Sequence, residues 1–393
     1  MSAQALDSTA PVFRRDPVTV LAYAALAAYA LVLYGLGPQL AFLRDELHLS
    51  YSVTSLHSVL FAAGTIVTGL LFGFLSRRFG RRRVLWFSAA GMAFGTLLFS
   101  VSQVLPLTLL SAAILGLAGT TLLSSTTVVL SDRHGVQRDR ALVEANILAS
   151  ASALCAPLLL GFLDHTPAGW RAELVVPALA IGLIYLFLGR VPMPPPVPAT
   201  HVAAAGRKLP PAFWVLVVLV ALVVGTEFSV VFFGASLVHV TTGVKVAVAA
   251  GAMGFFYGGE LIGRIAGTGL TRSPGRGPAV VAGALVVTAV GFVVLWTATS
   301  LPLAATGLFV TGLGVANLYP LSLALTLAVV PGLVDMATAR VQVMVGAAVL
   351  SAPFALAAAA DRVGVHTAFV LILVLVVLAT ALLIAARAAA SRR

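Results

Sequence analysis

Two residues of opposite charge, Glu260 and Arg264, stand in the middle of an apolar stretch, 251–271, which reads GAMGFFYGGELIGRIAGTGLT. They are four residues apart, so a helix would carry both on one face. At about 1.5 Å per residue the stretch is long enough to cross a bilayer. Charges at membrane depth are costly and usually face a bundle interior or a water-filled cavity. The pair therefore predicts a functional site inside the membrane; the alternative is a permanent structural ion pair between helices.

Proton transfer is the chemistry that these residue types favour. Glu227 lies about halfway along another apolar segment, 212–240. Burial in the membrane favours the neutral form of a carboxyl group, as a reversible proton carrier requires. Arg264 is always charged and opposes this effect for Glu260. Protonation of Glu260 would free Arg264 to bind an anionic group, so we predict that Glu227, Glu260 and Arg264 couple transport to protons.

The N-terminal half has no comparable charge at that depth. Glu144 lies near one end of the apolar segment 141–163, four residues after Arg140. That spacing predicts an ordinary salt bridge at a helix end. The sequence therefore predicts that protons are handled in the C-terminal half alone.

A substrate cavity would need polar side chains without charge. Prolines next to some candidates, Pro38 and Pro320, open a helix locally and free carbonyl groups toward a cavity. The residues that we predict to contact a small-molecule substrate are Tyr34, Gln39, Asn146, Tyr257, Asn317 and Tyr319.

Enzymatic chemistry has no support in the sequence. There is no phosphate-binding glycine loop followed by Lys-Ser/Thr, no metal-ligand cluster and no nucleophile motif. We expect no metal and no cofactor, and the missing nucleotide site argues against transport driven by ATP.

The composition indicates an all-α integral membrane protein. Of 393 residues, 60% are hydrophobic and 9% are charged, whereas soluble domains carry about 25% charged residues. Long unbroken apolar runs favour helices over the alternating strands of a barrel. The net charge of +11 does not predict nucleic-acid binding, because the basic residues fall in alternate loops between apolar segments. The expected partners are the lipid bilayer, protons and a small molecule, and we expect a functional monomer.

Twelve apolar segments divide the chain, and the even number puts both termini on one side. With the termini inside, nineteen Lys and Arg residues fall in inside loops and four in outside loops, which predicts cytoplasmic termini in a cell membrane. The predicted segments are 18–43, 53–76, 84–101, 104–131, 141–163, 172–189, 212–240, 246–271, 278–298, 302–330, 341–360 and 366–386.

A proline-rich stretch in the middle of the chain separates two sets of six helices. It contains PMPPPVP, and such clusters form extended linkers. The predicted parts are a cytoplasmic tail at 1–17, a bundle at 18–189, the linker at 190–211, a bundle at 212–386 and a tail at 387–393.

The two halves also share a faint repeat at a constant offset. The stretch 154–157 matches 350–353, Gly116 matches Gly312, and Gly73 matches Gly269. Weak internal symmetry is typical of two-half transporters whose substrate site lies near midplane between the halves.

The loop between the second and third segments carries a motif made of Gly73, Arg77, Arg78, Gly80, Arg81 and Arg82. It resembles the loop motif of the major facilitator superfamily. The resemblance implies two six-helix bundles with pseudo-two-fold symmetry, which rock about a central cavity in alternating access and are usually proton-coupled.

One position departs from the superfamily motif. Its aspartate, which helps to hold the outward-open state, is replaced by Arg77. We hypothesise a pair of reversed polarity, in which Arg77 or Arg78 meets Asp335 before the eleventh helix. The alternative is that the loop only anchors topology.

Two further resemblances point to opposite directions of transport. Ala156, Pro157 and Gly161 in the fifth segment look like a degraded form of the signature of proton-coupled exporters. The stretches 258–264 and 312–320 resemble sugar importers such as fucose permeases. We favour proton-coupled efflux by antiport. The alternatives are a proton symporter that imports a sugar or similar solute, and a membrane receptor or scaffold that transports nothing.

Overall fold

The computed structural model describes residues 13–193, 209–270, 277–330 and 333–391. All regular structure in these residues is helical. Twelve of the described helical segments are long and apolar enough to cross a membrane. The predicted all-α fold class is therefore confirmed.

The first half consists of α1 (Pro17–Glu46), α2 (Tyr51–Phe79), α3 (Arg81–Val101), α4 (Leu105–His134), η1 (Gly135–Gln137), α5 (Arg138–Asp164), η2 (Trp170–Leu174) and α6 (Val175–Leu188). The second half consists of α7 (Pro211–Thr242), α8 (Val246–Leu270), α9 (Gly277–Trp296), α10 (Leu301–Val315), α11 (Leu318–Ala328), α12 (Val334–Val363), α13 (Val365–Ala368) and α14 (Val370–Ser391).

The predicted segment 302–330 is broken into α10 and α11. Pro320 lies in the first turn of α11. Proline has no N–H group, and its ring clashes with the carbonyl group four residues earlier, here that of Ala316. Because Ala316 directly follows α10, the helix ends there and restarts beyond Asn317.

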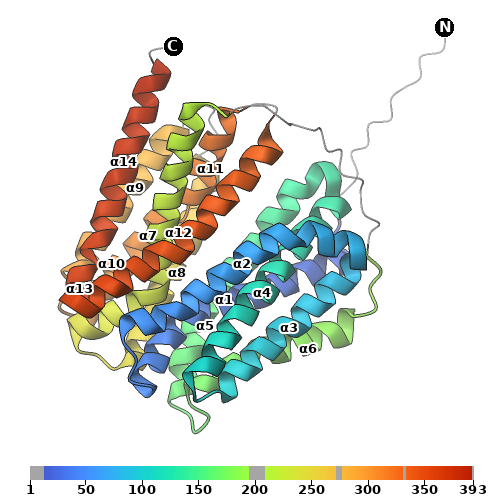
Figure 1. Cartoon of the computed structure of the whole chain (residues 1–393), viewed down its shortest axis with the longest axis horizontal. Helices are drawn as coiled ribbons and strands as arrows, with labels where there is room; N and C mark the ends of the chain where they lie inside the picture. Colours follow the sequence, from blue (N-terminus) through green and yellow to red (C-terminus); the bar gives the residue numbers. More distant parts are fainter. Residues whose placement is uncertain (1–12, 194–208, 271–276, 331–332, 392–393) are drawn as a thin grey trace.

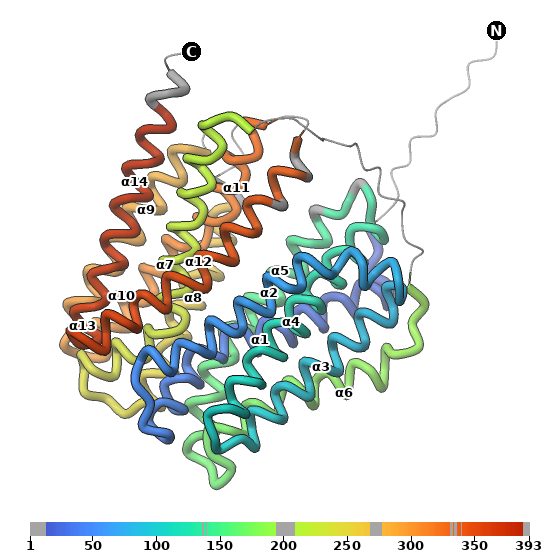
Figure 2. The backbone as a smooth tube through the Cα atoms, viewed as in Figure 1, coloured from blue at the N-terminus to red at the C-terminus, as the bar shows by residue number. Residues whose placement is uncertain are grey.

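The helices form two bundles, α1–α6 and α7–α14, which diverge toward the end of the molecule where α1 begins and α14 ends (Figure 1). We call this the terminal end; the other is the opposite end, where the two bundles lie together in Figure 2. Between the bundles α1 packs on α7, α2 on α12 and α5 on α8.

Matching glycines hold each bundle together. A Cβ atom added to Gly116 would lie 2.1 Å from the carbonyl oxygen of Phe61, and one added to Gly312 would lie 2.0 Å from that of Phe256. Only glycine permits such an approach of two backbones. The crossing of α2 with α4 is thus repeated by α8 with α10, and the faint sequence repeat corresponds to a structural one.

The loop motif ties helices together within the first bundle. Gly80 ends α2 with a φ of 80°, a conformation that favours glycine. Arg81 forms an ion pair with Asp132 of α4, and Arg82 donates a hydrogen bond to the carbonyl group of Gly189 after α6. These contacts fix α3 against its neighbours.

The reversed pair remains a prediction. Arg77 and Arg78 are exposed, and neither has an ion-pair partner among the described side chains. The side chain of Asp335 lies outside the described residues.

Glu144 is part of a salt bridge, as expected. It accepts from Arg140 at 3.2 Å and from Arg15 at 2.8 Å, and Tyr23 donates to it at 3.2 Å. The contacts with Arg15 and Tyr23 tie α5 to the start of α1.

Asp16 caps the first helix. Its carboxylate accepts from the backbone N–H of Thr19 at 3.0 Å and pairs with Arg133 at 2.5 Å. Partial burial opposes ionisation of Asp16, but the hydrogen bonds from Thr19 and Arg133 outweigh it and lower its pKa.

Candidate functional site

The Glu260–Arg264 pair lies on α8 and reaches across to the other bundle. Arg264 forms an ion pair with Glu260, whose side chain is 4% exposed. A second guanidinium nitrogen of Arg264, Nη1, donates to the hydroxyl of Ser150 on α5 at 2.6 Å. The pair therefore bridges the interface between the bundles as well as one turn of α8.

Glycines set the position of α8 between two neighbours. A Cβ atom on Gly259 would lie 2.1 Å from the carbonyl oxygen of Phe309 on α10, and one on Gly254 would lie 3.2 Å from Leu158 on α5. Small residues allow this close helix packing in a membrane. The glycines around the charged pair thus bring α8 against both α10 and α5.

Pro38 gives α1 an acceptor for the other bundle. Proline has no N–H group, so the carbonyl group of Tyr34, four residues earlier, loses its helical partner. The hydroxyl of Tyr257 on α8 donates to this carbonyl at 3.0 Å. The two tyrosine rings pack edge to face with centroids 5.1 Å apart. A break in one helix is therefore satisfied by a side chain of the opposite bundle.

Glu227 faces the same cluster from α7. It is 8% exposed and lies close enough to Glu260 and Arg264 to interact with both electrostatically. No hydrogen bond or ion pair joins it to any described residue. The structure thus brings the three predicted proton-coupling residues together with Tyr34 and Tyr257.

Three other predicted cavity residues each have a hydrogen-bond partner. Asn146 is exposed and donates to the carbonyl group of Leu142 in its own helix. Asn317 donates to the carbonyl group of Gly263 at 2.6 Å, which fastens the α10–α11 break to α8. Tyr319 accepts from Gln342 of α12 at 3.1 Å and lies in electrostatic range of Glu227. Of the three, Tyr319 is the one placed toward the charged cluster.

The motif of the fifth helix lies where α5 crosses α8. A Cβ atom on Gly161 would lie 3.5 Å from the carbonyl oxygen of Ala247. Ala156 is fully buried, and Pro157 lies inside α5. Pro157 and Gly161 therefore lie at the contact with α8, whereas Ala156 faces Gly35 of α1 in its own bundle.

Gln39 is bonded to a carboxyl group outside the charged cluster, one that the sequence analysis missed. Its amide donates to Glu173 of η2, and Glu173 is 0% exposed. The N-terminal half therefore does contain a buried ionisable side chain, which the sequence analysis did not consider. Glu173 is the second residue of the predicted segment 172–189, where an acidic residue resembles an ordinary segment boundary.

Asp361 was also missed. At the opposite end its carboxylate accepts from the backbone N–H groups of Tyr51 at 2.7 Å and Ser52 at 2.8 Å. The first N–H groups of a helix lack partners within it. Asp361 of α12 thus caps α2 of the other bundle, a contact that no local sequence pattern predicts.

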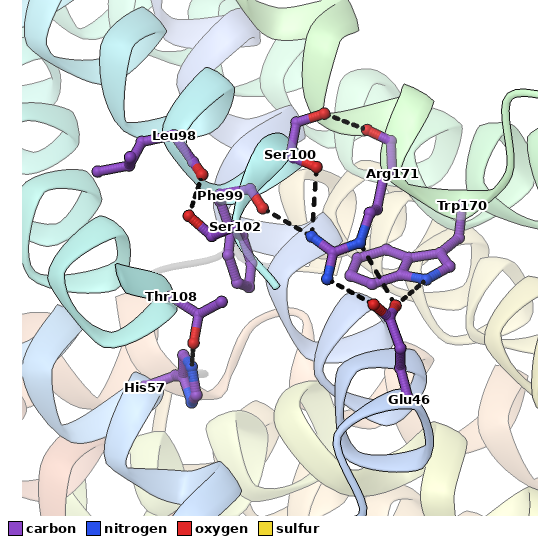
Figure 3. A network of polar contacts seen from close by, with 9 residues as sticks. All are labelled: Glu46, His57, Leu98, Phe99, Ser100, Ser102, Thr108, Trp170 and Arg171. Atoms are coloured by element: carbon purple, nitrogen blue, oxygen red, sulfur yellow. Dashed lines mark hydrogen bonds and ion pairs between the residues drawn. The ribbon is translucent and has the colours of Figure 1, made fainter. Parts of the chain in front are cut away.

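A polar cluster at the opposite end of the first bundle joins α1, η2 and α3 (Figure 3). Arg171 pairs with Glu46 at 2.9 Å and donates to the carbonyl groups of Phe99 and Ser100. The indole of Trp170 donates to the same Glu46 carboxylate at 3.1 Å. The cluster fastens the opposite end of the first bundle.

A cavity of about 640 Å³ opens between α3 and α6. Trp86, Tyr185 and Arg82 are among its lining residues. None of the cluster around Glu260 lines it, so this cavity and the charged site are separate features.

Comparison with known families identifies the chain. The model of the Major Facilitator Superfamily matches residues 22–304. The chain belongs to this superfamily. The fold of this superfamily accounts for the two bundles. A comparison with curated proteins gave no match.

Solved structures with the same superfamily fold cover nearly the whole chain. A bacterial homologue of the human lysosomal transporter Spinster, in an inward-facing and occupied conformation, is 15% identical with a TM-score of 0.74, over 94% of this chain and 95% of that one. The nucleoside transporter NupG is 12% identical with a TM-score of 0.73, over 95% and 98%. At these identities the similarity shows the fold alone.

Proposed function

We propose that this superfamily member exports a small, amphiphilic molecule in exchange for protons. It is a secondary transporter by its family. In the proposal it functions as a monomer in the cell membrane, with both termini in the cytoplasm because the basic residues gather at that side.

The observation that carries the proposal is the hydrogen bond by which the ion-paired Arg264 reaches the other bundle. Glu260 holds Arg264, and Arg264 also donates to Ser150 of the other bundle. Protonation of Glu260 removes the negative charge that holds the Arg264 guanidinium. The hydrogen bond from Arg264 to Ser150 therefore depends on whether Glu260 is protonated. Glu227 can then form an ion pair with Arg264, because it lies within electrostatic range of the guanidinium and has no other partner among the described residues.

Alternating access requires that the contacts at the opposite end open. The bundles diverge at the terminal end (Figure 1), which corresponds to the inward-facing conformation named for the Spinster homologue if that end is cytoplasmic. For the opposite end to open, Asp361 must release α2, and Tyr257 must release the carbonyl group of Tyr34.

The test is flux in proteoliposomes with an imposed pH gradient. Labelled amphiphilic cations, nucleosides and sugars would be offered to the wild type and to Glu260→Gln and Glu227→Gln. We expect both variants to lose gradient-driven flux, because neither amide can exchange a proton. Glu144→Gln, which alters a helix-end salt bridge, serves as the matched control and should keep its flux.

Import is the alternative, and the sign of the flux decides between the two. Movement of solute against the proton flow supports antiport, and movement with it supports a symporter. Undiminished gradient-driven flux in both glutamine variants would refute the assignment of the coupling residues.

A further inference from the structure

Glu173 is a buried carboxyl group that the proposed transport cycle does not use. It lies in η2 and is 0% exposed. Its Oε2 atom accepts from the amide of Gln39 on α1. Its Oε1 atom has no hydrogen-bond partner in the described part of the chain. A Cβ atom on Gly35 would lie 3.2 Å from Oε1, so the carboxyl group is pressed against the backbone of α1.

No charged side chain in the described part of the chain forms an ion pair with Glu173. Arg171, two residues earlier, is occupied by Glu46 and by the carbonyl groups at the end of α3 (Figure 3). Glu173 is buried, and its hydrogen-bond partner among the described residues is the uncharged amide of Gln39. The elements packed on η2 are α1, α3, α5 and α6. Near this end α3 and α6 have no titratable side chain. The charged or titratable groups on the facing parts of α1, α5 and the loop after α5 are Tyr34, Arg44, Asp45, Glu46, Cys155, Asp164 and His165. A buried carboxylate without a compensating charge is much less stable than the neutral acid, which favours a bound proton on Glu173 in this conformation.

Gln39 is a suitable hydrogen-bond partner for a carboxyl group that changes its protonation state. An amide offers two N–H donors and one carbonyl acceptor. Its N–H group can donate to a carboxylate, and after a rotation of the amide its oxygen can accept from a carboxylic acid. Arg264, by contrast, has donors only and is permanently charged. Gln39 can therefore bond to Glu173 with and without the proton.

The position of Gln39 links this proton to the interface between the bundles. Gln39 follows Pro38 on α1, the helix whose Tyr34 carbonyl group accepts from Tyr257. A Cβ atom on Gly37 would lie 1.9 Å from the carbonyl oxygen of Val231 on α7. The segment of α1 that holds Gln39 is thus in backbone contact with the other bundle.

We propose that Glu173 is a second proton-binding site, located in the N-terminal bundle, which is occupied while the opposite end is closed and empties when that end opens. The site is proposed to control closure of the opposite end and is not one of the proposed coupling residues, so binding of its proton can be measured without any flux. Loss of this proton would put an uncompensated charge inside the closed bundle, so deprotonation favours opening of the opposite end.

The first experiment is an infrared pH titration of the full-length protein in phosphatidylcholine vesicles, from about pH 5 to about pH 10, where a buried carboxyl group can titrate. We expect a band of protonated carboxyl that disappears as the pH rises. Glu173→Gln should lack this band. Glu46→Gln, which changes the neighbouring exposed carboxyl between the same two elements, should retain it.

The second experiment measures opening. Spin labels at Gln103→Cys and Thr299→Cys, exposed positions in loops of the two bundles at the opposite end, are placed in a Cys155→Ser background. In the otherwise unchanged protein we expect their separation to increase as the pH rises. Glu173→Gln imitates the protonated acid and should keep the short separation at high pH, while Glu46→Gln should open as the parent does.

The proposal is overturned if no titrating band is lost in Glu173→Gln, or if that variant opens with pH like its parent. If Glu173→Gln does not fold, Gln39→Met provides the test, because removal of the amide should shift the frequency of the Glu173 band. Absence of that shift overturns the assignment. Loss of the band together with normal proton-driven flux in Glu260→Gln would refute the proposed coupling residues but not this site.

Discussion

The two bundles share their backbone contacts and differ in their buried acids. Gly116 in one and Gly312 in the other place two helices in contact at corresponding points. Yet the carboxyl group of Glu260 is paired with a permanent cation, Arg264, and that of Glu173 with a neutral amide. Two bundles with the same backbone packing can thus hold their buried acids with partners of different charge.

The largest expected effect comes from removing the cation. Arg264→Met leaves Glu260 buried without its partner, which should lower the free energy of unfolding by about 3 kcal/mol. The double variant Glu260→Gln with Arg264→Met should recover most of the loss, because no unpaired charge remains. Thermal unfolding in detergent measures both. Arg78→Met, which removes an exposed arginine, is the control. If Arg264→Met is as stable as the wild type, burial of Glu260 does not require its ion pair with Arg264.

The shared glycine contacts give the next largest effect. Gly116→Ala and Gly312→Ala should each destabilise by about 2 kcal/mol, because the added methyl group meets a backbone carbonyl oxygen. Gly182→Ala faces open space and should cost nothing. The melting temperatures of the three variants test the structural repeat. A tolerated alanine at one of the two corresponding positions would show that the bundles are not packed alike.

The contact between Tyr257 and the freed carbonyl group of α1 should contribute about 1 kcal/mol. Tyr257→Phe should lose this amount in the wild-type background. In a Pro38→Ala background an N–H group returns to α1 and satisfies the Tyr34 carbonyl group, so the same substitution should lose less. A double-mutant cycle on unfolding free energies measures the difference. Equal losses in the two backgrounds would mean that Pro38 does not create the acceptor.

The smallest expected change in stability comes from Asp16, an acid at the edge of the first bundle that is ionised at neutral pH. Its pKa is lowered in the folded protein, so its contribution is present above its unfolded value, about 4, and is lost as the pH falls through the lower folded value. Asp16→Asn should destabilise by about 0.5 kcal/mol near neutral pH and not at all at strongly acidic pH. Melting temperatures across pH report this, and a pH-independent loss would argue against the ion pair with Arg133.

The sequence anticipated the features that arise within one helix or from composition. Apolar runs long enough to cross a membrane predicted the helices, and the spacing of Glu260 and Arg264 predicted their contact, since residues four apart share a helical face. The same spacing predicted the pair of Arg140 with Glu144. Boundaries were less well predicted where a proline or a short 3₁₀ turn interrupts a long apolar run, as at Asn317.

Which residues meet across helices was decided by the tertiary structure alone. Gln39 resembles a cavity residue until Glu173 is found against it, 134 positions away. Asp361 resembles an ordinary helix-end acid until α2 is placed beside it. Hydropathy and periodicity report which residues are buried and on which face. They carry no information on which distant face is packed opposite, because that depends on how the bundles fit together.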